Sequence, residues 1–416
     1  MANDVTTRGI RHRTGYIVLA ATTAMVIAMG VGRFAYTPIL PLMHGQTDLD
    51  AQGAAALATA NYLGYLVGAV AAIFVTTLAT RTVVLRTTAL LLVASLALMP
   101  VSESVPLWWI LRFVAGVMSA IIFVYAVRVA HQELSGTRNG PGWVFGGVGV
   151  GIALSGICVL SLGSTGSWIT AWLMMAVLAA VGTVIAWWLP GGRTPKAALA
   201  DATDVSDVDE ARAGKKTVAV VQDDSFPVDR RRRFVWLCLS YFLEGVGYIV
   251  AGTFIVAALS TPALPSWLGS GAWILVGLAI FPSCVFWNWM SKKVARPWLL
   301  VTALSIQTVG VALPALSAAP AAALLAAVLF GGTFVGIASM SLAEGAALIG
   351  ARAAAILTAL YGVGQVLGPI VVTPLLSTGP DTYARALEVG AMVVAVGALC
   401  AVPVGRAVRR RSAAER

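Results

Sequence analysis

Charged residues are scarce in this sequence. Only 11% of its 416 residues are Asp, Glu, Lys or Arg, whereas 59% are hydrophobic. A soluble domain carries about 25% charged residues, so water cannot be the main solvent around this chain. The shortage excludes an ordinary soluble globular protein and indicates a protein that is embedded in a lipid bilayer.

Residues that build metal, disulfide and catalytic sites are also few. The cysteines form no CxxC pair and the histidines are scattered along the chain: Cys158, Cys238, Cys284, Cys400, His12, His44 and His131. We therefore expect no disulfide framework, no metal site and no cofactor. A Gly-rich phosphate loop of the GxxxxGK[ST] type is missing as well, which disfavours an ATP-driven pump.

Long apolar runs are abundant. A helix needs about 20 apolar residues to cross the hydrocarbon core of a bilayer, and twelve such runs occur. We predict an all-α protein with transmembrane helices near 16–40, 53–79, 83–100, 106–130, 141–163, 168–190, 234–259, 267–290, 298–317, 320–343, 353–377 and 384–405.

The same local sequence occurs twice, 215 residues apart. Gly30-Val31-Gly32-Arg33 returns as Gly245-Val246-Gly247-Tyr248, and Gly147-Val148-Gly149-Val150 returns as Gly362-Val363-Gly364-Gln365. At the same offset Gly116 matches Gly331 and Arg81 matches Arg296. A repeat of this kind in a membrane protein predicts two pseudo-symmetric six-helix halves with a transport site between them.

The basic residues fix the predicted orientation. With the N-terminus in the cytoplasm, 25 of the 28 lysines and arginines fall on the inner side of the membrane. The outer side receives Arg385 and the acids Asp48, Asp50, Glu103 and Asp381. Because this is the positive-inside pattern, we expect a multi-pass protein of the cell (inner) membrane with both termini in the cytoplasm. The net charge of +10 is then explained by the membrane topology and does not indicate binding of nucleic acid.

Four segments follow from these patterns. We predict an N-terminal half over 1–190, a cytoplasmic linker over 191–233, a C-terminal half over 234–405 and a basic cytoplasmic tail over 406–416. The linker combines low hydrophobicity with many charges, which is typical of disorder. Its closing run Arg230-Arg231-Arg232-Arg233 suits a contact with anionic lipid at the inner leaflet.

Three ionisable residues fall well inside the predicted spans: Arg33, Arg112 and Glu244. A charge near the middle of a bilayer costs at least ~2.5 kcal/mol, so such residues normally face a partner or a cavity and mark function. Glu244 lies ten residues past Phe234, close to the midplane. Desolvation disfavours the charged form of a buried Glu, so we expect it to carry a proton. The alternative is a structural Glu that is paired with an arginine or hydrogen-bonded to a neighbouring helix.

Arg33 is expected to bind the substrate. The repeat register places Arg33 opposite Tyr248, with Glu244 one helical turn from Tyr248. A guanidinium in this position could hold an anionic group bidentately, pair with Glu244 as a gate, or reach out to the membrane surface. Tyr36, three residues after Arg33, is a further candidate for binding.

Two other motifs suggest roles in packing and binding. Arg112 precedes Gly116 by four residues, and a glycine on an apolar helix permits close approach of a neighbour. We expect this pair to be structural or part of a gate. Glycines in the spans 141–163 and 353–377 permit close packing in the same way. Tyr361 and Gln365, in the second of these spans, could offer hydrogen bonds to a substrate.

These motifs resemble those of the major facilitator superfamily. Arg112-x-x-x-Gly116 is similar to the arginine motif of its fourth helix, and Gly362 to Pro369 resembles its glycine-proline motif, here in the eleventh span rather than the fifth. The loop after the second span departs from the family, because it keeps only Arg81 and Arg86 and lacks the usual Asp. This puts the family's charge relay at the inner gate in doubt.

A narrower resemblance concerns the first and seventh spans. The run from Gly30 to Met43 looks like the first-helix signature of the YbfB/YjiJ-type branch, and Glu244 to Ile249 is similar to its seventh-helix segment. The resemblance implies a monomeric transporter of a small solute.

We therefore predict a secondary active transporter, coupled to protons, that works by alternating access. The arginines favour an anionic or zwitterionic solute, whereas the aromatic residues favour drug-like compounds and hence a multidrug exporter. The alternative from another class is a polytopic membrane enzyme such as a transferase, which would need clustered catalytic side chains. A sensor or scaffold would need an added soluble domain for its output.

Overall fold

Apolar helices build the whole described part of the chain. The computed structural model describes all residues except 1, 135–139, 192–227, 351, 377–381 and 415–416. Twelve helices are long and apolar enough to cross a membrane, in agreement with the predicted number, and no strand occurs among the described residues.

The helices follow one another in two groups. The N-terminal group contains α1 (Ala2–Met25), η1 (Val26–Val31), α2 (Tyr36–Gln46), α3 (Ala51–Phe74), η2 (Thr76–Ala79), α4 (Thr82–Ala97), η3 (Met99–Val101), α5 (Val105–Leu134), α6 (Gly140–Ser161), η4 (Gly163–Thr165) and α7 (Trp168–Ala186). The C-terminal group contains α9 (Val228–Leu259), α10 (Leu268–Met290), α11 (Arg296–Leu316), α12 (Pro320–Ile349), α13 (Arg352–Val372), η5 (Thr373–Leu375) and α14 (Thr382–Ala414).

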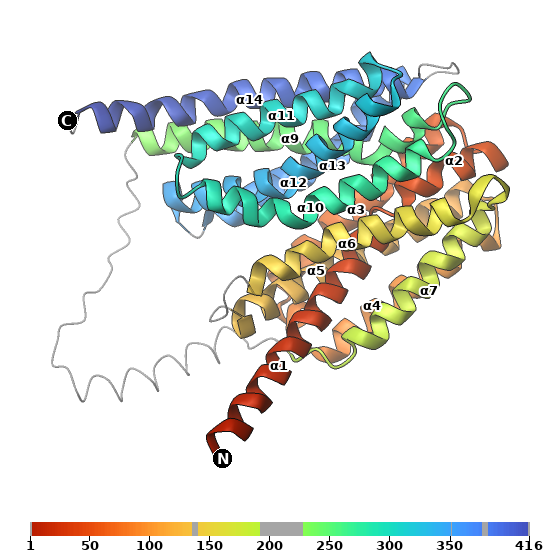
Figure 1. The fold of residues 1–416 in the computed structure, drawn as a ribbon, viewed down its shortest axis with the longest axis horizontal. Coiled ribbons are helices and arrows are strands. Elements are labelled where there is room, and N and C mark those ends of the chain that lie inside the picture. The colour runs from red at the N-terminus through yellow and green to blue at the C-terminus, as the bar shows by residue number, and fades with distance from the viewer. Residues whose placement is uncertain (1, 135–139, 192–227, 351, 377–381, 415–416) are drawn as a thin grey trace.

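The two groups form two bundles that lie side by side (Figure 1). The main contacts between the bundles are those of α3 with α13, α6 with α10, and α2 with α9. In the view of Figure 1 the bundle ends nearest the chain termini are farther apart than the opposite ends.

Most of the predicted linker lies outside the described residues, namely 192–227. Its last six residues are helical, because α9 already begins at Val228 and therefore includes the four consecutive arginines 230–233. The side chains of the predicted basic tail also lie outside the described residues beyond Arg406.

The first span is broken, whereas a continuous helix over 16–40 was predicted. It runs from Thr14 to Gln46, but a π-helix at Val26–Val31 and a turn over residues 32–35 separate α1 from α2. Pro38 contributes to the break because it has no N–H and its ring clashes with the carbonyl group four residues earlier, that of Phe34. The matching span α9 is continuous, so the two halves differ here.

Glycines bring helices from different bundles close together. A Cβ atom on Gly149 of α6 would collide with the carbonyl group of Gly277 of α10, and a Cβ atom on Gly277 would collide with Ala153 of α6. These contacts explain the glycine pattern of the 141–163 span, since small residues allow the backbones to approach.

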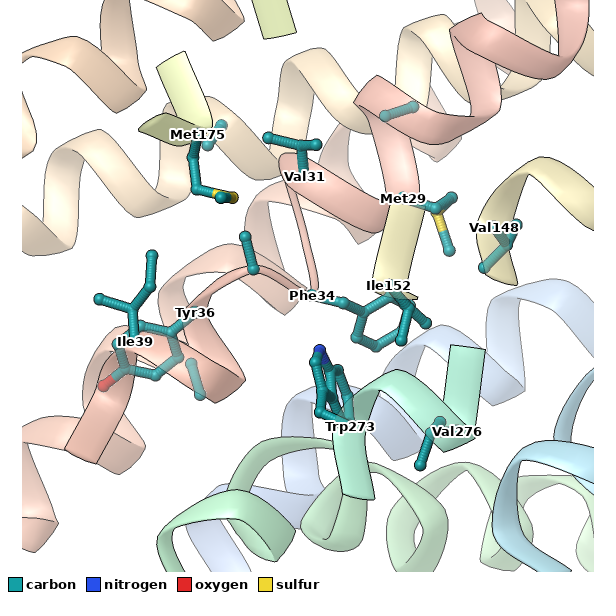
Figure 2. Close-up of a cluster of buried hydrophobic side chains, with 14 of the residues drawn as sticks. Met29, Val31, Phe34, Tyr36, Ile39, Val148, Ile152, Met175, Trp273 and Val276 are labelled. Atoms are coloured by element: carbon teal, nitrogen blue, oxygen red, sulfur yellow. The ribbon is translucent and has the colours of Figure 1, made fainter. Parts of the chain in front are cut away.

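Two clusters of buried side chains fill the protein. One extends through the N-terminal bundle and across the interface, and the other lies among α9, α11, α12 and α14. Figure 2 shows part of the first, where Phe34 at the break of the first span points toward Trp273 of α10 and Ile152 of α6. Many large apolar side chains remain exposed on the outside of the helices, such as Val184 and Leu399 at 71% and 69%, as expected of a lipid-facing surface.

Candidate functional site

The broken first span exposes backbone carbonyl groups in the middle of the protein. Arg112 of α5 donates from Nη2 to the carbonyl oxygen of Arg33 at 3.1 Å and from Nη1 to that of Gly32 at 3.3 Å. Asn61 of α3 also donates to the Gly32 carbonyl, at 3.3 Å, and to that of Arg112 at 3.0 Å. Buried carbonyl groups need such partners, so Arg112 and Asn61 support the break and thereby position Arg33.

Arg33 itself points away from this support, toward the C-terminal bundle. Its side chain is 2% exposed, and Nη2 donates to Oε1 of Gln365 of α13 at 2.5 Å. Among the described residues no carboxylate pairs with it, and its Nε has no hydrogen-bond partner. The guanidinium lies over the ring of Tyr65 at 4.2 Å and over that of Tyr62 at 5.1 Å, an arrangement that stabilises a cation.

Gln365 joins Arg33 to Tyr248. The side-chain oxygen of Gln365 accepts from Arg33 while its nitrogen donates to the Tyr248 hydroxyl group. Arg33 and Tyr248 are therefore brought together as the repeat register predicted, with Gln365 between them.

Tyr248 belongs to a row of parallel aromatic rings. Tyr361 stacks on Tyr241 at 4.3 Å between ring centroids and on Tyr248 at 5.3 Å, with interplanar angles of 12° and 9°. Tyr248 continues the row onto Phe334 at 4.9 Å and 17°, and Phe330 lies beside both rings, 6.5 Å from Tyr248 and 6.4 Å from Phe334. The row comes from α9, α12 and α13, so all its rings belong to the C-terminal bundle. The Tyr361 hydroxyl, which we expected to offer a hydrogen bond, has no partner among the described residues.

Glu244 of α9 is fully buried, and neither of its carboxyl oxygens has a hydrogen-bond partner among the described residues. Its polar neighbours are the Tyr361 hydroxyl and the side-chain amide of Gln307 on α11. Both of these also lack partners. Glu244 therefore forms no ion pair with Arg33, which was one of the two structural alternatives that the sequence left open.

Tyr36 has a different setting from Arg33. Its hydroxyl donates to the carbonyl of Ala54 at 3.0 Å, and its ring lies under the Arg112 guanidinium at 5.0 Å. These contacts place Tyr36 with the residues that support the break. Gly116 lies against the backbone of Asn61, so the close approach predicted for the motif of Arg112 and Gly116 occurs between α5 and α3.

Sequence reasoning missed several polar residues of the site. Asn61 and Gln307 carry no charge, and nothing in an apolar run distinguishes them from packing residues. Tyr62, Tyr65 and Tyr241 were missed as well. Their spacing could have indicated them, because Tyr62 and Tyr65 are three residues apart, as are Tyr241 and Glu244, and residues so spaced share a helix face. The described residues contain no group of three His, Cys, Asp or Glu side chains that could hold a metal ion.

An ion pair was missed as well. Arg233 at the start of α9 and Glu344 near the end of α12 lie 3.1 Å apart with side chains 10% exposed. The predicted spans ended one residue short of each partner, and the run of arginines that includes Arg233 was expected to contact anionic lipid.

The chain matches a known family and known folds. A family model described as "Uncharacterised MFS-type transporter YbfB" matches residues 25–402. Among solved structures, the nucleoside transporter NupG superposes with a TM-score of 0.69 at 12% identity, covering 94% of this chain and 98% of that one. A mutant of the peptide transporter POT gives a TM-score of 0.67 at 14% identity, with 95% and 94% covered. A search of curated proteins gives no match.

Proposed function

The chain belongs to the YbfB-type family of the major facilitator superfamily, and from this premise we propose that it is a proton-coupled secondary transporter that works by alternating access. That it is a multi-pass membrane transporter follows from the family and from the fold of its twelve spans. Substrate, coupling and mechanism are the proposal.

The single observation that supports a role in substrate binding is the buried guanidinium of Arg33. It is a buried cation between the two bundles, and its side-chain hydrogen bond among the described residues is to the neutral amide oxygen of Gln365. An uncompensated charge at membrane depth is expensive and marks a functional site. An anionic or zwitterionic solute would supply the missing negative charge, so we place the substrate next to Arg33, Gln365, Tyr248 and Tyr361.

Alternating access is supported by how the bundles touch. The contacts of α6 with α10 are made by small residues such as Gly149 and Gly277, whose surfaces allow helices to move against each other. Across the centre, the polar bonds that join the bundles among the described residues include Thr37 to the Gly252 carbonyl at 2.5 Å and Tyr62 with Thr253 at 2.8 Å. The farther separation of the bundles at the terminal end (Figure 1) fits a form that opens toward that side.

Glu244 is our candidate for proton coupling. It lies one turn from Tyr248 on α9, and the row of tyrosines separates it from Arg33. Because no cation neutralises it, gain or loss of its proton changes the charge of the C-terminal bundle. Such a change can alter how this bundle rests against Arg33.

We place the protein in the cell membrane with both termini in the cytoplasm, because the charge distribution follows the positive-inside rule. The family favours transport over the transferase activity that the sequence left open. A multidrug exporter is the second candidate, favoured by the row of aromatic rings.

Purified protein in proteoliposomes tests the proposal. Solutes of defined charge are added under an imposed pH gradient, and their entry and the internal pH are followed. Protein-dependent accumulation of an anionic or zwitterionic solute, accompanied by proton movement and lost in R33Q, is expected. Accumulation that persists without any pH gradient, or that is unchanged in R33Q, would contradict it.

A further inference from the structure

The buried arginines of this protein differ in how their donors are used. Arg112 gives both terminal nitrogens to carbonyl groups, and Arg233 has Glu344 as its counter-ion. Arg33 has neither, although it is as buried as Arg112, at 2% and 1% exposure. Since a guanidinium carries five N–H donors in a planar fork, Arg33 retains the capacity to bind one further planar acceptor.

The charges around Arg33 limit which acceptor fits. Arg112 is already engaged with the backbone, so Arg33 is the one cation available at this point of the described structure. Glu244, next to the Tyr361 hydroxyl of the tyrosine row, would repel a second negative charge. A singly charged carboxylate fits this balance better than a phosphate, because a carboxylate matches the arginine fork with one charge.

The aromatic side chains near Arg33 favour a solute whose carboxylate is attached to an aromatic ring. The rings of Tyr241, Tyr361, Tyr248 and Phe334 stand nearly parallel, with successive interplanar angles of 12°, 9° and 17°. Parallel rings gain from an offset-stacked aromatic partner. Tyr361 is only partly buried, so its ring is the most accessible of the row.

Gln365 connects the guanidinium of Arg33 with the row of aromatic rings. Its amide oxygen occupies one acceptor position on Arg33 while its nitrogen bonds to Tyr248. A carboxylate has the same planar shape as the oxygen side of this amide and carries the charge that the amide lacks. A ligand carboxylate would thus take the place of Gln365 on Arg33.

We propose that the transported solute is an aromatic monocarboxylate, bound with its carboxylate on Arg33 and its ring against the tyrosine row that includes Tyr248 and Tyr361. This rests on the proposed transport function and names its substrate class. Because the bond from Arg33 to Gln365 crosses between the bundles, displacing it with the ligand loosens the two halves at the same moment as the substrate binds.

Ligand binding to the purified protein tests the substrate class. Thermal unfolding and calorimetry are compared for benzoate, its neutral analogue benzamide, its saturated analogue cyclohexanecarboxylate, and the cation benzylamine. Benzoate should bind at least about tenfold more tightly than benzamide, since its carboxylate offers Arg33 an opposite charge and two acceptor oxygens, whereas the neutral amide offers one acceptor oxygen and no charge. Cyclohexanecarboxylate should bind more weakly than benzoate, and benzylamine should not bind.

Matched variants assign the effect to the site. R33Q should abolish the preference for benzoate over benzamide, and R33K should restore part of it, since an ammonium keeps the charge without the fork. R86Q is the control, because Arg86 also lies over aromatic rings, those of Trp187 and Trp188, but on α4 away from the interface. F334L should reduce the advantage of benzoate over cyclohexanecarboxylate.

The outcomes separate the substrate class from transport itself. Equal binding of benzoate and benzamide, or benzoate binding that survives in R33Q, overturns the aromatic carboxylate. Proteoliposomes that exchange another class of solute, with no benzoate binding, also overturn it but leave the transporter intact. Arg33-dependent benzoate binding without exchange of any solute would support the site and refute transport.

Discussion

Arg33 and Gln365 are 332 positions apart in the sequence, yet the guanidinium of one donates to the amide oxygen of the other at 2.5 Å in the centre of the protein. The bond joins the broken first span of the N-terminal bundle to α13 of the C-terminal bundle. Because Gln365 is neutral, the bond is weaker than an ion pair would be, which suits a contact that has to open during transport.

Replacing Gln365 with Glu should convert this bond into an ion pair. The present bond already involves the charge of Arg33, and a carboxylate would add an opposite charge and a bidentate geometry, so Q365E should raise the temperature of unfolding and slow exchange of substrate about tenfold or more. The double variant R33Q/Q365E should lose the added stability. Q52E, at an exposed position of α3, is the control. Faster exchange in Q365E would refute the idea that the bond between Arg33 and Gln365 has to open during transport.

Arg112 should behave as a structural residue. In R112A the carbonyl group of Arg33 loses its donor and that of Gly32 keeps only Asn61, and each unsatisfied buried group costs about 1–3 kcal/mol. R112A should therefore unfold at a clearly lower temperature than the parent, and R112K should recover part of the loss. R33Q should affect stability much less, so equal destabilisation by R33Q and R112A would contradict this division of roles.

The ion pair of Arg233 and Glu344 should stabilise the C-terminal bundle. Removing one partner of a nearly buried pair leaves an uncompensated charge and costs up to about 3 kcal/mol. R233E and E344R should each unfold at lower temperature, and the double variant with the charges exchanged should recover most of the stability. A double variant no better than the sum of the two single changes would show that the pair contributes little.

The orientation in the membrane can be tested with single cysteines in a cysteine-free background. Ser104 precedes α5 and Lys292 follows α10, and both are exposed. With the termini in the cytoplasm, S104C should react with a membrane-impermeant thiol reagent in intact cells, whereas K292C should react only after permeabilisation. The reverse pattern would invert the topology.

Much of the fold could be predicted because its determinants are local. Apolar runs and their flanking charges can be counted along the sequence, and the structure has the predicted number of spans. The break in the first span could not be predicted, although the sequence has a proline, Pro38, within this span. Proline also occurs within continuous helices, at Pro282 of α10 and Pro369 of α13, so proline alone does not identify a break.

The site was most readily predicted where a charge interrupts an apolar run. Arg33, Arg112 and Glu244 stand out for that reason. The role of Arg112 at the backbone depends on carbonyl groups that become free only when the first span breaks, so no sequence pattern indicates it. The place of Gln365 between Arg33 and Tyr248 depends on how two distant bundles pack, and the register of the repeat gave only their approximate proximity.

Glu244 should determine how transport responds to a pH gradient. E244Q keeps the size of the side chain and its hydrogen-bonding groups but fixes it in a neutral form. If Glu244 carries the proton, the parent should accumulate substrate when a pH gradient is imposed. The direction of accumulation depends on whether proton and solute move together (symport) or in opposite directions (antiport). E244Q should lose this accumulation yet still exchange substrate between the two sides, since exchange needs no net proton movement.

The control for E244Q is E388Q, because Glu388 also lies within a span but on its exposed face. Initial rates of accumulation are measured for both variants at a series of imposed gradients, alongside exchange without a gradient. The parent and E388Q should respond to the gradient alike, and E244Q should give a flat response. If E244Q accumulates substrate with the same dependence on the gradient as the parent, Glu244 does not carry the proton. Its burial beside Gln307 and Tyr361 would then have to be explained by packing of the C-terminal bundle alone.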